Sequence, residues 1–350
     1  MRNVLNQRAG MIECMLKPFR EIHAKDLDPG SLNEEINAHG YLLLKGLIST
    51  KDVRHLLDEI VELLHGAGWF IKDSDPASRV INASSACGDP DPAFKSIYEK
   101  VFSLESFHAF AHHAALRQVM HQLVGPNLLI HPKPIGRLIF PNCERLIIHA
   151  HQDHRAISGD SDSYTVWMPL HDCPPELGPL QILEASHRYG LQSIDPETGI
   201  IPKESACGGD WVGGHLNAGD ALIFHSLTVH AASANVSNQL RISMDCRFQS
   251  AERAIDPANL VFPGSSKERS WETTYSNWHS DRLKYFWMKM PLKLKPSRAE
   301  LAELTQTATS ERMRSRYATI LSQLDSQISS GSVRLYDNTN PDQLHPQEDR

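Results

Sequence analysis

Between Pro126 and about residue 250, the chain alternates short β-type runs with turns rich in Gly, Pro, Asn and Asp. Runs of this length and spacing are typical of an all-β sandwich or barrel, because βαβ units would place helical patterns between successive strands. We therefore predict strands at 127–131, 135–140, 145–150, 163–170, 180–184, 221–225, 228–231 and 239–249. This pattern restricts the fold more than any other feature of the sequence.

Helical patterns lie on both sides of this β-rich region. Apolar residues within 51–65 recur at the i, i+3, i+4 and i+7 spacing of an amphipathic helix, and Ser49 or Thr50 can cap its N-terminus. We also expect helices within 92–124, 272–290 and 298–327, and a strand at 41–45. The predicted fold class is mainly β with flanking helices. The predicted divisions are an N-terminal arm (1–34), a single domain (35–290), a C-terminal helix (291–328) and a flexible tail (329–350).

The net charge excludes two classes of partner. Lys and Arg total 35 against 42 Asp and Glu, which gives a formal net charge of −7 at pH 7. A basic surplus favours binding to nucleic acid or to an anionic membrane, so we expect neither. No apolar stretch is long enough for a transmembrane helix, and the first residues do not resemble a secretory signal. Six scattered cysteines without a C-x-x-C pair favour reduced thiols and a cytoplasmic protein.

Nineteen histidines direct the search for a site toward a metal. The pattern His-x-Asp occurs at His151–Asp153 and again at His279–Asp281. On a strand, residues i and i+2 point to the same side, so His151 and Asp153 can converge on one ion. His279 and Asp281 fall in an expected helix, where side chains two residues apart diverge, and we discard that pair.

A third ligand would have to come from another strand. Two imidazoles and one carboxylate on one face of Fe(II) leave positions open for a cosubstrate and dioxygen. The segment 219–233 offers both His225 and His230, and its residues alone do not decide between them.

The next strand, 239–249, is polar on one face and apolar on the other. Its polar residues are Arg241, Ser243, Asp245 and Arg247. In an ordinary sandwich this face would be solvated, whereas in a barrel that encloses a polar ligand it points inward. In a barrel, Arg241 and Ser243 would be placed to bind a carboxylate, with the arginine in a bidentate arrangement.

Taken together, these motifs resemble the phytanoyl-CoA dioxygenase family of Fe(II)/2-oxoglutarate oxygenases. H-Q-D at 151–153 is followed by G-D-x4-H-x4-H from Gly219, with an arginine eleven residues after the last histidine. Three further stretches resemble the family's T-x-W-x-x-L strand, its G-P-L…G-S-H stretch with Ala185 in place of glycine, and its N-terminal G-Y-x4-G entry. They lie at 165–170, 178–187 and 40–46. The resemblance covers roughly residues 35–250.

The resemblance implies a ligand set and a cosubstrate. It assigns His151, Asp153 and His230 to iron and leaves His225 as a non-ligand. It assigns Arg241, with Ser243 beside it, to the far carboxylate of 2-oxoglutarate. It also implies a double-stranded β-helix core of the jelly-roll or cupin-like kind.

Other candidate residues are less specific. Arg137, Thr165 and Trp167 project from neighbouring strands and are expected to line the cosubstrate or substrate pocket. Trp167 is equally compatible with plain core packing, and Arg137 with an ion pair to a structural carboxylate. His154 and Trp211 are candidate substrate contacts, and the glycine-rich segment around Trp211, 205–216, is a candidate lid.

The function implied by the resemblance is hydroxylation of a small organic metabolite, such as a natural-product intermediate, using O2 and releasing succinate and CO2. Desaturation or ring closure is a related outcome. Halogenation is disfavoured, because Asp153 occupies the position at which halogenating members carry a small residue. Two alternatives are a cupin-like metal enzyme that does not use 2-oxoglutarate and a non-catalytic binding barrel.

Overall fold

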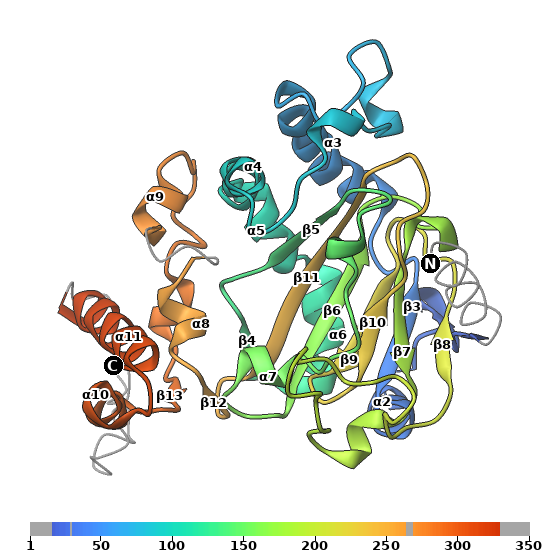
Figure 1. The fold of residues 1–350 in the computed structure, drawn as a ribbon. Coiled ribbons are helices and arrows are strands. Elements are labelled where there is room, and N and C mark those ends of the chain that lie inside the picture. Colours follow the sequence, from blue (N-terminus) through green and yellow to red (C-terminus); the bar gives the residue numbers. More distant parts are fainter. Residues whose placement is uncertain (1–15, 29, 264–268, 330–350) are drawn as a thin grey trace, which may run out of the picture.

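Two β-sheets of unequal size face each other in the computed structural model, which describes residues 16–28, 30–263 and 269–329 (Figure 1). The larger sheet has the order β2–β3–β9–β6–β11–β4, with β5 also paired to β11. Its strands are β2 (Glu21–His23), β3 (Tyr41–Lys45), β4 (Leu128–Ile130), β5 (Ile135–Ile139), β6 (Ser163–Pro169), β9 (Ala221–His225) and β11 (Arg241–Ser250). The smaller sheet has the order β1–β8–β7–β10. Its strands are β1 (Lys17–Pro18), β7 (Leu180–Leu183), β8 (Trp211–Gly213) and β10 (His230–Ala232).

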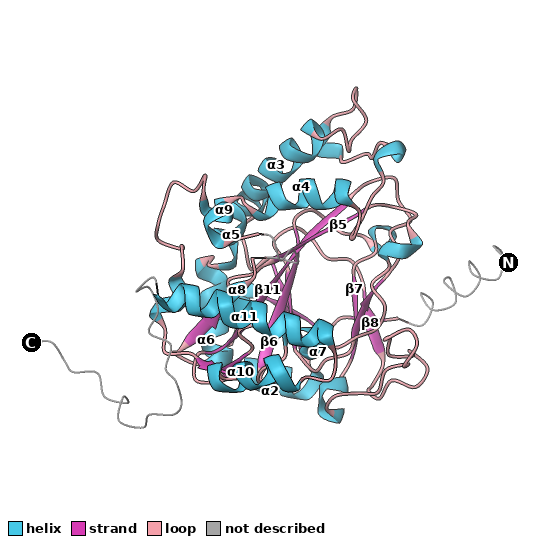
Figure 2. Cartoon of the chain, turned by 60° about the vertical axis from the view of Figure 1, so that its left-hand side comes forward, coloured by secondary structure: helices cyan, strands magenta, loops and turns pink. Residues whose placement is uncertain are grey.

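Helices cover the outer face of the larger sheet and one end of the molecule. The N-terminal helices are α2 (Leu32–His39), α3 (Thr50–Gly66), α4 (Pro92–Phe102), α5 (Glu105–Ala111) and α6 (Ala114–Val124). The later helices are α7 (His154–Ile157), α8 (Ala258–Val261), α9 (Trp271–Tyr275), α10 (Arg298–Thr307) and α11 (Glu311–Ser329). Figure 2 shows α3 and α4 together at the top of the molecule, beside β5. A third sheet joins β12 (Ala254–Ile255) to β13 (Lys293–Leu294). No helix in the described ranges has the length and apolar character needed to cross a bilayer.

The alternation along β11 sorts its side chains between two environments. The apolar members pack into the large core beneath the helices; they are Ile242, Met244, Cys246 and Phe248. The polar members are also almost fully shielded; they are Arg241, Ser243, Asp245, Arg247 and Gln249. Their side of the larger sheet belongs to a second core, in which Leu222 and Phe224 of β9 meet Leu180 and Ile182 of β7. The polar face therefore points inward, as the barrel interpretation requires.

Several sequence expectations need correction. Helices occupy 38% of the described residues, so "mainly β" overstates the strand content, although the sheets do form the core. The expected strand at 145–150 is instead a 3-10 turn, Glu144–Leu146, followed by irregular chain. The expected helix 272–290 is broken after α9, because the Glu105 carboxylate accepts the backbone N–H groups of His279 and Ser280.

The two ends of the chain also differ in detail from the expectation. Residues from Lys17 onward, expected in an N-terminal arm, form β1 and β2 and join both sheets. The single helix expected over 298–327 is two helices, α10 and α11. The predicted tail, 329–350, lies almost entirely outside the described residues.

Candidate metal and cosubstrate site

Three side chains that the sequence singled out converge at one end of the interior. His151 and Asp153 lie in the segment between β5 and β6, and His230 begins β10. One ligand atom from each of these residues lies within 4.8 Å of the others. The Nε2 atoms of His151 and His230 are 3.7 and 3.9 Å from Oδ1 of Asp153. Backbone hydrogen bonds of 3.0 Å in both directions join His151 to His230, so the two imidazoles are fixed relative to each other.

Both histidines present the same nitrogen to this centre. Nδ1 of His151 donates to the carbonyl oxygen of His149 at 2.8 Å, and Nδ1 of His230 donates to that of Thr228 at 3.0 Å. A carbonyl only accepts, so the proton lies on Nδ1 and the lone pair of Nε2 faces Asp153. Burial lowers the pKa of His230 to about 3, with the nearby His151 adding to the effect. His230 is therefore the neutral imidazole that a metal ligand must be.

Asp153 is held by residues on the larger sheet. Oγ1 of Thr165 on β6 donates to its Oδ2 at 2.6 Å, and Nη2 of Arg247 on β11 lies 3.7 Å from its Oδ1. Burial alone would raise the pKa of Asp153, but the positive charge of Arg247 outweighs burial and holds this pKa well below its usual value. The carboxylate is therefore ionised and oriented before any ligand arrives. Thr165, which we expected to line the cosubstrate or substrate pocket, directs its hydroxyl at Asp153.

His225, the alternative third ligand, lies outside this cluster. Its Nδ1 accepts the backbone N–H of Leu227 at 3.1 Å, and its ring packs against Tyr164 and His187. The ligand set His151, Asp153 and His230 is therefore the one that the geometry favours.

Arg241 contributes a buried and largely unpartnered guanidinium. It is 0% exposed, and Nη1 donates to the carbonyl oxygen of Gly178. Among the described residues, its Nε and Nη2 have no hydrogen-bond partner, and the same is true of Ser243 Oγ and Trp167 Nε1. Burial lowers the pKa of Arg241 to about 10, which shows how poorly the surroundings compensate its charge. Buried donors are normally satisfied, so this group of donors requires an explanation.

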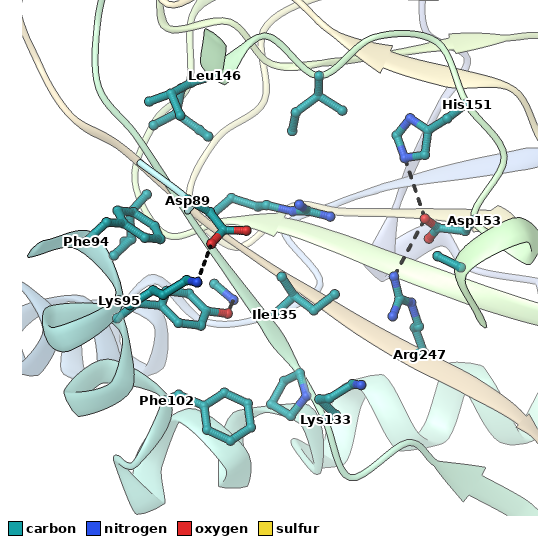
Figure 3. Close-up of a pocket in the computed structure, with 18 of the residues that line it drawn as sticks. Asp89, Phe94, Lys95, Phe102, Lys133, Ile135, Leu146, His151, Asp153 and Arg247 are labelled. Atoms are coloured by element: carbon teal, nitrogen blue, oxygen red, sulfur yellow. Dashed lines mark hydrogen bonds and ion pairs between the residues drawn. The ribbon is translucent and has the colours of Figure 1, made fainter. Parts of the chain in front are cut away.

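Arg137 forms an ion pair with a structural carboxylate, which was one of the two roles that the sequence offered. Its Nε donates to Oδ2 of Asp245 at 2.8 Å, across the β5–β11 pairing that sets Arg137 opposite Ser243. Arg137 also lines a pocket of about 540 Å³ beside His151 and Asp153 (Figure 3). It is therefore a pocket-lining residue whose charge is balanced within the protein.

The two candidate substrate contacts lie elsewhere. Trp211 is in β8, where its ring lies 4.5 Å from Nζ of Lys203, and it is not among the residues that line the pocket. The expected lid 205–216 is tied to its neighbours: β8 pairs with β7 and β1, and Gly209 donates to the carbonyl oxygen of Glu184 at 2.7 Å. His154 opens α7 with a backbone hydrogen bond to Ser226 and also lies outside the pocket lining.

Two residues of the site have no role in the sequence interpretation. Arg247 was placed on the polar face of 239–249, but only the structure brings it to Asp153. Lys133 precedes β5 and lines the pocket, and no motif marks it. The even spacing of the polar residues along 239–249 was a usable signal for Arg247, whereas Lys133 follows only from tertiary structure.

The residues present fit both an iron ion and its cosubstrate. Two Nε2 atoms and one carboxylate on one side of a common centre form the 2-His-1-carboxylate arrangement typical of non-haem Fe(II) oxygenases. The unpartnered donors of Arg241, Ser243 and Trp167 are the groups that a buried carboxylate would satisfy.

Comparisons with known proteins agree with this geometry. A family model described as phytanoyl-CoA dioxygenase (PhyH) matches residues 36–243. The 1-deoxypentalenic acid 11-beta-hydroxylase of Streptomyces exfoliatus is 24% identical over 264 residues, which are 69% of this chain and 89% of that protein. The protein of the same name from Streptomyces arenae is 23% identical over 263 residues, with the same coverage.

Among solved structures, the epimerase SnoN in complex with Fe3+, alpha ketoglutarate and nogalamycin RO shares the fold. Its TM-score is 0.51 at 20% identity, over 69% of this chain and 93% of that chain. The family match spans more than half of this chain and includes all three ligand positions, Arg241 and Ser243. This chain therefore belongs to the phytanoyl-CoA dioxygenase family and is a 2-oxoglutarate-dependent non-haem iron oxygenase.

Proposed function

We propose that this protein hydroxylates a small organic metabolite, with His151, Asp153 and His230 as the Fe(II) ligands and Arg241 as the anchor of 2-oxoglutarate. When bound, iron and 2-oxoglutarate supply the oxidising chemistry, in which O2 converts 2-oxoglutarate to succinate and CO2 and one oxygen atom enters a substrate C–H bond. The observation that carries the proposal is the coincidence of two incomplete sites in one interior. One is a preformed triad of ligands, and the other is a set of buried donors that find no acceptor in the described part of the chain.

The protein's part is to hold charges in place before the cosubstrate enters. Arg241 offers Nε and Nη2 to a carboxylate in a water-poor interior, where such a pair is much stronger than in solution. Ser243 Oγ on the same strand face can donate to the same carboxylate. Thr165 fixes the orientation of Asp153 through the hydrogen bond that its hydroxyl donates.

The names of the relatives support a natural-product intermediate as the substrate. The two curated relatives are named for 1-deoxypentalenic acid, and the structure that shares the fold was determined with nogalamycin RO. The pocket beside His151 and Asp153, at about 540 Å³, offers room for a molecule of small-metabolite size. Desaturation and ring closure remain outcomes of the same site, because both also begin at a substrate C–H bond.

Two further parts of the proposal concern architecture and setting. The two facing sheets support a double-stranded β-helix core within a single domain over 35–290. The described cysteines, Cys87, Cys143, Cys173, Cys207 and Cys246, are all free, which supports a reducing, cytoplasmic setting.

The test is an anaerobic titration of the Fe(II)-loaded protein with 2-oxoglutarate, recorded as the weak visible charge-transfer band of the chelate. The wild type is expected to develop the band, and His151→Ala to lose it. His149→Ala is the matched control, because His149 is an exposed histidine two residues away that contributes only its carbonyl oxygen to the site. It is expected to keep the band. Absence of the band in fully metallated wild type would overturn the proposal in favour of a metal enzyme that does not use 2-oxoglutarate. A band that persists in His151→Ala would refute this ligand assignment.

A further inference from the structure

The substrate pocket has two chemically different ends. Figure 3 shows His151, Asp153 and Arg247 at one end, and Leu146, Phe94 and Phe102 at the other, where the Lys95–Asp89 ion pair also lies. The apolar wall is contributed mainly by α4, β5 and the chain after the Glu144–Leu146 turn. It includes Phe94, Tyr98, Phe102, Ile135, Leu146 and Ile147. Tyr98 belongs to this wall through its ring, because its hydroxyl is engaged by the backbone N–H of Gly136 at 3.0 Å.

The same pocket is lined by more cations than anions, and all but one of these cations are balanced. Four of the five have a carboxylate within 4 Å. The pairs are Lys95–Asp89 at 3.9 Å, Arg137–Asp245 at 2.8 Å, Arg145–Asp91 at 2.9 Å and Arg247–Asp153 at 3.7 Å. Lys133 is the exception, because no carboxylate of the described residues lies within 4 Å of its ammonium group.

The surroundings of Lys133 increase this imbalance. Figure 3 shows Lys133 near Arg247, and the positive charge of Arg247 acts on it. The acidic group that acts on Lys133 is Asp256, whose Oδ1 already accepts the backbone N–H of Ala258 at 2.8 Å and which also faces Arg316. Burial lowers the pKa of Lys133 to about 8, with Arg247 and Arg316 adding to the effect and Asp256 opposing it.

We propose that the substrate is a small, largely apolar monocarboxylate, whose carboxylate pairs with Lys133 while its hydrocarbon body lies against the wall formed by α4 and β5. This inference rests on the proposed function, because it assigns the pocket beside His151 and Asp153 to the substrate. A monoanion matches the pocket because one cationic charge has no carboxylate partner among the described residues. A neutral substrate would leave Lys133 without a counterion in a partly buried site, which is the costlier arrangement.

The test compares apolar acids with their uncharged amides. Binding is measured by isothermal titration calorimetry to protein that holds Fe(II) and 2-oxoglutarate, without oxygen. The probes are cyclohexanecarboxylate, adamantane-1-carboxylate and 2-naphthoate, each with its primary amide, and 2-naphthyl phosphate. At least one acid is expected to bind roughly 10- to 100-fold more tightly than its amide, as for one charged hydrogen-bonded pair.

Two lysine variants test whether Lys133 causes the preference for the acid. Lys133→Met keeps the length of the side chain and is expected to abolish the preference for the acid while leaving amide binding unchanged. Lys95→Met is the matched control, because Lys95 lines the same pocket but has Asp89 as its partner. It is expected to keep the preference.

Three results would overturn the inference. They are the absence of any acid that binds better than its amide, a preference that survives in Lys133→Met, and tighter binding of the phosphate than of every carboxylate. The charge-transfer band is recorded on the same samples. A band without a preference for acids contradicts only this inference. The absence of the band overturns the proposed function and, with it, the assignment of the pocket.

Discussion

Replacing Arg241 by Met should weaken 2-oxoglutarate binding strongly without destabilising the protein that lacks the cosubstrate. The guanidinium is fully buried, and within the described residues its one hydrogen bond goes to the Gly178 carbonyl, while Nε and Nη2 are unpartnered. Met is shorter than Arg, but it replaces the aliphatic part of the side chain and carries no charge to leave uncompensated. The structure thus separates the loss of 2-oxoglutarate binding from the loss of protein stability, which usually coincide when a buried arginine is removed.

The magnitudes follow from the burial. Removing one partner of a buried charge pair costs about 3–5 kcal/mol, so the Kd for 2-oxoglutarate should rise by roughly 100-fold or more. In the cosubstrate-free protein, exchanging an unbalanced buried ion for an apolar side chain is neutral or stabilising by about 1–4 kcal/mol. At a 2-oxoglutarate concentration 100 times the wild-type Kd, binding stabilises the wild type by about 2.7 kcal/mol, and a variant weakened 100-fold by only about 0.4 kcal/mol.

The assay is thermal unfolding of the metallated protein with and without 2-oxoglutarate, combined with the Kd from the charge-transfer band. Arg253→Met serves as the control, because Arg253 is 52% exposed and pairs with Asp160 and Asp162 outside the interior. Wild-type affinity in a folded Arg241→Met protein would refute the assignment of Arg241. So would a loss of more than about 3 kcal/mol of stability in the absence of 2-oxoglutarate, since the guanidinium would then be a structural group.

Three further predictions address the surroundings of the site. Thr165→Val removes the 2.6 Å hydrogen bond to Asp153 and should weaken Fe(II) binding roughly 10-fold or more in a metal titration. Thr165→Ser should recover the affinity for Fe(II). Unchanged affinity in Thr165→Val would contradict the positioning role of Thr165. The lowered pKa of Lys133, about 8, means that its charge is present below pH 8 and lost above it. The affinity for adamantane-1-carboxylate should therefore decline between pH 7 and 9 in the wild type but not in Lys133→Arg. Parallel pH profiles in the two proteins would contradict the prediction. Gly178 has φ +72°, and a Cβ there would meet backbone atoms of the chain that follows β10. Gly178→Ala should therefore lower the free energy of unfolding by more than the roughly 1–2 kcal/mol expected for Gly190→Ala, where the added Cβ meets nothing. Urea unfolding compares the two variants, and equal losses of stability would show that the close contact is relieved without cost.

The polar side chains of β11 show how far sequence alone could lead. Their alternation with apolar residues predicted that Arg241 and Ser243 share a face, and the position of Arg241 eleven residues after His230 identified its strand. The direction of that face needed the second sheet, because only the contact of Phe224 with β7 residues shows which side is interior. A period of two fixes which residues are neighbours but does not fix which face is buried.

Other outcomes depended on residues far apart in the chain. Trp211 follows a glycine-rich run that indicates flexibility, yet long-range pairing with β7 and β1 makes it part of a strand. Arg137 meets Asp245 because of the β5–β11 register, which involves residues more than 100 positions apart. The apolar stretch around Leu146 satisfies a strand pattern but instead contributes to the pocket wall. In each case a non-local partner decided the outcome, and no local pattern contains that information.

The triad has a mechanical consequence, because its members belong to both halves of the sandwich. His230 begins a strand of the smaller sheet, whereas Asp153 is held by Thr165 on the larger one. An ion bound to His230 and Asp153 would cross-link the two sheets, and its binding free energy would oppose fluctuations that separate the sheets. Amide hydrogens of β10 should then exchange more slowly with solvent in the metallated protein, whereas those of α10 and α11, far along the chain from the ligands, should exchange at the same rate in both forms.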